Sequence, residues 1–360
     1  MAPFPKEKEH IHTLSELTLN PSRASESLAY VSSLNEQERA ELVSLADSNH
    51  VVLRAFEPLR MAALARGDNT ILDWVEAIKQ KEKARIANAL RYLDTVCKAL
   101  EAAGCQVAVM KSLDHWPDLG NDLDLYSTAD DERIKAVMTD KFQAKVEHQS
   151  WGDRLAHKWN FAVPGLPEAI EVHAKRLGQT GEHTALARRF VTRRVPKEVG
   201  GYTFMVPAPE ERIIVATLQR MYRHFYFRVC DVSNTAALVE SGAVDFAELK
   251  KAADLGGIWL GVCSYLRIVS DYVKEYRGRG VDLPQNLVSA APFGGEVISV
   301  RGKFLRVPIM PKGAELYARQ VTEAAFRGDV PATFRLSLLP YLAGAAAISY
   351  KLTGSDKGIW

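Results

Sequence analysis

Residues 107–126 read VAVMKSLDHWPDLGNDLDLY, and we expect the fold to be organised around them. The apolar run 107–110 predicts a short strand that brings the cation of Lys111 and the hydroxyl of Ser112 to its end. Ten residues after Ser112, Asp122-Leu-Asp124-Leu predicts a second strand. Because side chains alternate along a strand, Asp122 and Asp124 share one face while the leucines enter the core.

Neighbouring carboxylates repel each other and raise each other's pKa, so such a pair calls for a cation between them. Oxygen ligands of this kind suit a hard divalent ion such as Mg²⁺. A third carboxylate, Glu171, shares a face with His173 on a strand over 169–173, which residues 158–163 precede as the other half of a hairpin. Three carboxylates on neighbouring strands are the usual protein part of a two-metal site for phosphoryl transfer.

This order of motifs resembles the nucleotidyltransferase superfamily, whose fold is polymerase-beta-like, and more closely its uncharacterised bacterial members. The resemblance covers roughly Leu45 to Tyr276 and rests on the order of its motifs more than on any one of them. It implies an α+β fold, with a mixed sheet flanked by an N-terminal helical region and a C-terminal helical bundle. The segments that carry it are 100–111, 122–124 and 170–173.

The same resemblance implies a metal-dependent nucleotidyltransferase that moves a nucleoside monophosphate from an NTP to an acceptor hydroxyl. Such a site uses Mg²⁺ or Mn²⁺, which bridges the phosphates and lowers the pKa of the acceptor hydroxyl. The acceptor, a protein or a small molecule, is not identified by the sequence. The implied catalytic residues and metal ligands are Asp122, Asp124 and Glu171, and the implied nucleotide-binding residues are Lys111, Ser112, Lys158 and His173.

Several of these residues have a structural alternative that the sequence leaves open. Lys111 either neutralises phosphate charge or packs locally, and His173 either orients Glu171, contacts the base or bonds to backbone within a strand. Two positions depart from the family pattern. Ser112 stands where the closer family usually has glycine, and Asp118 stands where it often has an arginine.

The composition narrows the class of protein. Lysine and arginine exceed aspartate and glutamate by only two charges over 360 residues, so a long nucleic acid is the least favoured acceptor. Four cysteines lie far apart without a Cys-x-x-Cys pair, which indicates thiols in a reducing compartment. The charged start of the chain lacks the apolar core of a signal peptide, and we therefore expect a cytoplasmic protein.

The N-terminal part divides into a disordered tail over 1–13, rich in proline and charge, and a helical region over 14–104. Asn35 and Glu38 have the spacing of a capping box and predict a helix over 36–47. Apolar residues at steps of three and four predict one long amphipathic helix over 70–103, ended by Gly104.

Residues 105–207 are expected to form the catalytic domain, with Thr128 as the N-cap of its first helix. Its basic stretch 188–194 is interpreted as a solvated face. Residues 208–281 are expected to form the helical bundle, in which Arg228 and Asp231 are interpreted as an ion pair within one helix.

The remaining residues, 282–360, lie beyond the resemblance and are expected to contain a hairpin over 297–307. The uncharged segment 336–350 is shorter than the ~20 residues that span a bilayer, and is interpreted as a helix packed on the bundle. Peripheral membrane contact through this segment stays open. Two other functions stay open with it: a catalytically silent nucleotide-binding module, and an interaction protein with a membrane-surface segment. The sequence does not indicate the oligomeric state.

Overall fold

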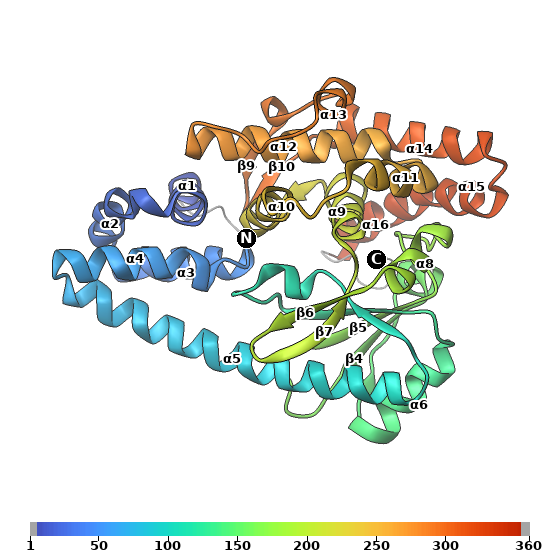
Figure 1. The fold of residues 1–360 in the computed structure, drawn as a ribbon, viewed down its shortest axis with the longest axis horizontal. Coiled ribbons are helices and arrows are strands. Elements are labelled where there is room, and N and C mark those ends of the chain that lie inside the picture. Colours follow the sequence, from blue (N-terminus) through green and yellow to red (C-terminus); the bar gives the residue numbers. More distant parts are fainter. Residues whose placement is uncertain (1–5, 354–360) are drawn as a thin grey trace.

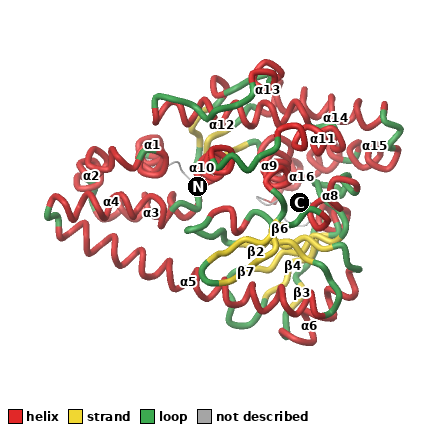
Figure 2. Tube along the Cα trace, viewed as in Figure 1, coloured by secondary structure: helices red, strands yellow, loops and turns green. Residues whose placement is uncertain are grey.

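A mixed β-sheet lies at one side of the molecule, and helical layers cover its faces and extend away from it (Figures 1 and 2). The computed structural model describes residues 6–353. Its main sheet has the strand order β1-β2-β5-β4-β3, in which β2 and β5 are parallel and the other pairs are antiparallel. These strands are β1 (Val107–Val109), β2 (Asp122–Ser127), β3 (Lys145–Val146), β4 (Lys158–Ala162) and β5 (Ala169–Ala174). The predicted α+β class, with a mixed sheet between helical regions, is confirmed.

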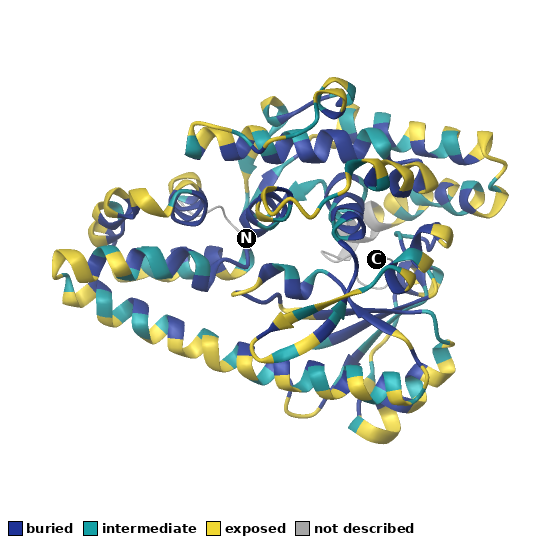
Figure 3. Ribbon diagram, viewed as in Figure 1, coloured by how far each residue is buried: buried dark blue, intermediate teal, exposed yellow. Residues whose placement is uncertain are grey.

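The helix α5 connects the sheet to the N-terminal helices. It spans Asn69–Ala102 over 34 residues, and its first half packs with the N-terminal helices through Ile71 and Val75. Its second half packs against the sheet through residues such as Leu90 and Leu93, and buried and exposed positions alternate along it (Figure 3). The amphipathic helix predicted for this region is therefore confirmed, and Gly104 follows it with a φ of +75° that favours glycine.

The remaining elements surround this framework. The N-terminal helices are α1 (Glu7–Leu19), α2 (Ala24–Ser33), α3 (Glu36–Ser48) and α4 (Val52–Arg66). The sheet region adds α6 (Asp131–Phe142), α7 (Trp151–Ala156), α8 (Ala185–Thr192) and the two-stranded β6 (Val195–Val199) and β7 (Tyr202–Val206). The bundle consists of α9 (Pro209–Thr217), the π-helical turn η3 (Leu218–Arg223), β8 (Tyr226–Phe227), α10 (Val229–Glu240), α11 (Phe246–Gly256) and α12 (Trp259–Arg277).

The C-terminal extension is integrated into the fold. It contains α13 (Gln285–Ala290), β9 (Ser299–Arg301), β10 (Phe304–Arg306), α14 (Ala314–Phe326), α15 (Val330–Ser337) and α16 (Leu339–Thr353). The expected hairpin is present as β9 and β10, and β10 also pairs with β8 of the bundle. One hydrophobic core includes residues of the N-terminal helices, the bundle and this extension. The domain boundaries at 104, 207 and 281 stay predictions.

Three local predictions concern helix starts. The capping box is confirmed, since Asn35 and Glu38 exchange both of its hydrogen bonds at the start of α3. The prediction of a disordered tail over 1–13 is wrong from Glu7 onward, because α1 begins at Glu7 and the buried His10 forms a hydrogen bond with Tyr30. Residues 1–5 of that prediction lie outside the described residues. Thr128 is not an N-cap, because α6 begins at Asp131 and Asp130 precedes it.

The segment 336–350 is helical from α15 into α16, but it is not packed on the bundle as expected. Tyr341 is 77% exposed and Ile348 is 61% exposed. The smaller residues at 343–345 are also exposed. Among the α16 side chains whose burial is described, Leu339 is partly buried and packs against a small apolar cluster of α14 and α15. None of the helices within 6–353 has both the length and the hydropathy required to cross a membrane.

Candidate active site

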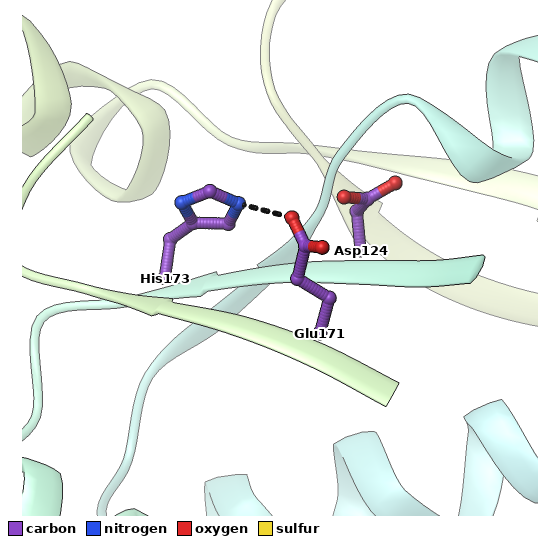
Figure 4. Close-up of side chains that lie close together, drawn as sticks. All are labelled: Asp124, Glu171 and His173. Carbon is purple, nitrogen blue, oxygen red and sulfur yellow. Dashed lines mark hydrogen bonds and ion pairs between the residues drawn. The ribbon is translucent and has the colours of Figure 1, made fainter. Parts of the chain in front are cut away.

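Two carboxylates from neighbouring strands form the centre of the candidate site. Asp124 of β2 and Glu171 of β5 are partners in the parallel register, and both side chains are buried. The Nε2 of His173, two residues along β5, lies 2.7 Å from Oε1 of Glu171 (Figure 4). One ligand atom from each of these three residues lies within 4.8 Å of the others. The alternation predicted for both strands thus brings Asp124, Glu171 and His173 together.

Two lysines face these carboxylates. The ammonium of Lys111 pairs with Asp124 and lies 3.9 Å from Oε1 of Glu171. The ammonium of Lys158, at the start of β4, lies 2.7 Å from Oε2 of Glu171 and 3.3 Å from Asp153. Both lysines predicted to bind nucleotide are therefore at the site, where they neutralise the acids.

The surroundings separate the pKa values of the two carboxyl groups. Burial raises the pKa of Asp124 to about 7, with Lys111 opposing and Glu171 reinforcing the effect. Burial also acts to raise the pKa of Glu171, but Lys111, His173 and Lys158 together hold it well below its usual range. Burial lowers the pKa of His173 to about 4 although Glu171 opposes it, so this imidazole is neutral at pH 7. Since ionised Glu171 can only accept, the Nε2–H of His173 is the donor in their hydrogen bond.

The backbone at Lys111 is strained. Its φ of 52° and ψ of −60° form a γ-turn, in which the N–H of Ser112 donates to the carbonyl of Met110. This conformation is rare for a residue other than glycine, and strain of this kind concentrates at functional sites. The turn directs the Lys111 side chain, which is 14% exposed, toward the acid pair.

Ser112, which was predicted to contact a phosphate, makes its hydrogen bonds within the protein. Its buried hydroxyl donates to the carbonyl of Asp122 and accepts from the N–H of Asp124. Because its own N–H is also used in the γ-turn, neither group is free to contact a phosphate. Ser112 instead fixes the strand that carries both aspartates, and we interpret it as a positioning residue.

Asp122 lies at the mouth of the site and not within the cluster. It is the exposed first residue of β2, and its register partner is Ala169. Partial burial of its carboxyl group, and then the nearby Glu171 carboxylate, raise the pKa of Asp122. Asp122 still lines the same cavity as Asp124 and Glu171.

This cavity, which we term the acid pocket, has a volume of about 340 Å³, within the range of small-molecule sites. The sheet supplies its acids, and the bundle supplies three arginines, Arg220, Arg223 and Arg228. The sequence analysis assigned no role in the site to these arginines. It also did not identify the other lining residues His50, His115, Gln219, His224 and Tyr226. Of these, Gln219, Arg220 and Arg223 are carried by the π-helical turn η3, an irregularity frequently found at functional sites.

The prediction of an ion pair between the side chains of Arg228 and Asp231 is wrong. The Asp231 carboxylate accepts from the backbone N–H of Arg228 at 2.6 Å and pairs with Arg220, whose Nε lies 2.7 Å away. The Arg228 side chain lines the acid pocket, and its Nε has no hydrogen-bond partner in the described part of the chain. Arg228 is therefore available to a phosphate.

The basic stretch 188–194 lies outside the acid pocket, and it is ion-paired where a solvated face was expected. Arg189 and Arg193 both pair with Glu211, which is fully buried. Arg194 pairs with Glu101 at the end of α5. These arginines join elements of the fold through ion pairs.

Asp118, the other departure from the family pattern, stabilises a helix. Its carboxyl accepts from the N–H groups of Leu53 and Arg54 at 2.6 and 3.1 Å, at the start of α4. Burial raises the pKa of Asp118 to about 7, although these bonds and Arg54 oppose it. Asp118 does not line the acid pocket, so its presence does not argue against an active site there.

A pH prediction follows for Asp118. The pKa of Asp118 in the folded state is about 7, above the ordinary value of 3.8, so the folded state binds more protons between these two pH values. The contribution of Asp118 to the free energy of unfolding is therefore present at low pH and is lost as pH rises through about 7. We expect the urea midpoint of the wild type to fall relative to that of Asp118→Asn between pH 5 and pH 8. A rise in the urea midpoint of the wild type relative to that of the variant would show that the ionised carboxylate stabilises α4 more than the protonated carboxyl does.

The residues of the acid pocket fit a divalent cation. Buried carboxylate oxygens converge from Asp124 and Glu171, and two ammonium groups already balance the acids. Asp122, at the mouth of the pocket, adds a third carboxylate. The lysines show that these carboxylates are arranged to face positive charge.

Three comparisons with known proteins bear on the family of this chain. The family model described as uncharacterised nucleotidyltransferase matches residues 35–274. A solved structure, that of an antigenic nucleotidyltransferase-like protein from Paracoccidioides brasiliensis, is 14% identical, covers 46% of this chain and 85% of its own, and has a TM-score of 0.32. That score is too low to support a structural argument. No curated protein matches the chain.

Proposed function

Because the chain belongs to the uncharacterised nucleotidyltransferase family, we propose that it transfers a nucleoside monophosphate from an NTP to an acceptor hydroxyl. The observation that carries this proposal is the register pairing of Asp124 and Glu171 in a pocket whose opposite wall is basic. Acids that hold a metal and cations that hold phosphates are the two parts a phosphoryl-transfer site requires. The acceptor, a protein or a small molecule, is not fixed by these residues.

The charges of the acid pocket suggest a role for each side. Arg223 and Arg228 line the wall opposite the sheet, where guanidinium groups can bind phosphate oxygens in a bidentate manner. Lys158 is placed to hold Glu171 ionised, and the His173 N–H orients the same carboxylate. Mg²⁺ or Mn²⁺ held by Asp124 and Glu171, with Asp122 at the mouth, would neutralise phosphate charge and lower the pKa of the acceptor hydroxyl.

Lys111 supports a second candidate function. Its ammonium already pairs with Asp124, so the acid pocket is neutralised without any metal. A catalytically silent module that binds and senses nucleotides would have this property. It predicts that NTP binding does not depend on Asp124, whereas the transferase needs Asp124 for metal-dependent binding and for transfer.

The test is transfer of label from α-³²P-NTP in a cell lysate. The purified protein is incubated with each NTP and Mg²⁺ or Mn²⁺, with and without EDTA. We expect label on an acceptor and its loss in EDTA. NTP binding without transfer from any of the four nucleotides would favour the silent module, and calorimetric titration of Mg²⁺–NTP distinguishes this result from the absence of binding.

A further inference from the structure

A second cavity adjoins the acid pocket, and neither substrate of the proposed reaction has been placed in it. We term it the side pocket. It shares Lys111, Gln219 and Arg223 with the acid pocket, so the two cavities meet at these side chains. His173 lines the side pocket and not the acid pocket. A group in the side pocket would therefore lie next to the nucleotide that the acid pocket is proposed to hold.

His173 presents an unused hydrogen-bond acceptor here. Only 5% of the residue is exposed, and its Nε2–H donates to Glu171. Its Nδ1 is buried and has no hydrogen-bond partner within residues 6–353. Figure 4 shows this nitrogen turned away from both carboxylates. With Nε2–H donating to Glu171, Nδ1 is left to accept a hydrogen bond, and buried acceptors in native proteins are normally satisfied, so Nδ1 is open to an O–H or N–H donor that enters the side pocket.

The size of the side pocket limits what it can receive. Its volume is about 50 Å³. One water needs roughly 10–15 Å³, and a pocket that encloses a whole ligand has about 300 Å³ or more. Its walls include the buried apolar side chains of Met110, Leu177 and Leu218. The side pocket thus fits a branch of a larger molecule, with a short carbon stem and one polar hydrogen.

The outer wall comes from the C-terminal extension, beyond residues 35–274 that match the family. Tyr317 and Gln320 of α14 and Leu339 of α16 line the side pocket. Hydrogen bonds hold this wall on the catalytic region: the Gln320 amide lies 3.1 Å from the ring of His183, and Arg335 donates to the carbonyl of Leu155 at 2.8 Å. The pocket is therefore built by this chain's own extension.

We propose that the side pocket receives the acceptor, and that the acceptor is an aliphatic hydroxyl on a stem of one or two carbons, bonded to Nδ1 of His173. This inference rests on the proposed function. The hydroxyl oxygen forms a bond to the α-phosphorus of the NTP, and the bond from that phosphorus to the β-bridging oxygen breaks. Pyrophosphate leaves, and the hydroxyl proton passes to solvent. Serine and threonine side chains and the hydroxymethyl group of a small molecule share this chemistry.

The first test identifies the labelled atom. Lysate labelled with each of the four α-³²P-NTPs is separated into protein and small-molecule fractions, and mass spectrometry locates the nucleoside monophosphate. We expect it on serine or threonine in the protein fraction, or on a hydroxymethyl group in the small-molecule fraction. Attachment to a tyrosine phenol, an amine, a carboxylate or a ring hydroxyl of nucleic acid would overturn the inference while leaving the transferase intact. Absence of transfer would contradict the proposed function and this inference with it.

The second test blocks the side pocket. Leu339→Trp fills it from α16, and Gln179→Trp fills it from the opposite wall. We expect each variant to lose transfer at least tenfold while its calorimetric affinity for Mg²⁺–ATP stays within twofold of the wild type. Tyr341→Trp, at a 77% exposed position on the same helix as Leu339, is the matched control. Wild-type transfer by both filled variants, with unchanged nucleotide binding, would show that the acceptor enters elsewhere.

Discussion

Asp124→Asn is expected to lower nucleotide transfer by about 10³-fold, since charge stabilisation at a metal site contributes several kcal/mol and each ~1.4 kcal/mol changes the rate tenfold. The substitution removes one of the two buried carboxylates and the partner of Lys111. The measurement is the initial rate of transfer from α-³²P-NTP. It is accompanied by circular dichroism and by calorimetric titration of Mg²⁺–NTP.

Asp254→Asn provides the matched control, because Asp254 is an exposed aspartate paired with Lys250 on α11. It makes the same chemical change far from the acid pocket and should leave transfer unchanged. If Asp124→Asn is folded and transfers at a rate near that of the wild type, Asp124 is not a metal ligand. If the wild type itself binds NTP without transfer and Asp124→Asn binds equally well, the silent module is supported.

Asp231→Ala is expected to lower the free energy of unfolding by about 3–5 kcal/mol, the usual cost of leaving one partner of a buried ion pair uncompensated. Arg220 is 2% exposed and pairs with Asp231, which is 7% exposed. The change also removes the acceptor for the N–H of Arg228 at the start of α10. Urea unfolding followed by circular dichroism measures the effect.

The comparison for this prediction is Asp254→Ala, which breaks an exposed pair of the same charge types. Exposed pairs spaced by four residues on a helix contribute about 0.3–0.5 kcal/mol, so little change is expected. A loss below about 1 kcal/mol in Asp231→Ala would show that solvent or another group compensates Arg220. The position of η3, which forms one wall of the acid pocket, would then not depend on the ion pair between Arg220 and Asp231.

The acid pair and its strands could be predicted because their signals are local. Alternation along a strand places Asp124 on a defined face, and the hairpin of β4 and β5 brings Lys158 beside Glu171. The long helix α5 followed from periodicity alone. These patterns depend on neighbours in sequence, and a single chain contains that information.

The basic wall could not be predicted, because it depends on packing between distant segments. Arg223 lies in the π-helical turn that follows α9, and no local sequence pattern indicated where the α-helix would change to a π-helix. The roles of Ser112 and Asp118 depend on backbone groups they meet only in the folded chain. Burial of α1 likewise required its tertiary partners, since its first turn and His10 are charged or polar in sequence.

The central claim is that the α-phosphate, and not the γ-phosphate, moves to the acceptor. Parallel reactions with α-³²P-NTP and γ-³²P-NTP in the same lysate test it most directly. We predict label on the acceptor from the α-labelled nucleotide only, with the γ label recovered in pyrophosphate. Label on the acceptor from the γ-labelled nucleotide, together with free NDP, would contradict the account and identify a phosphotransferase on the same scaffold.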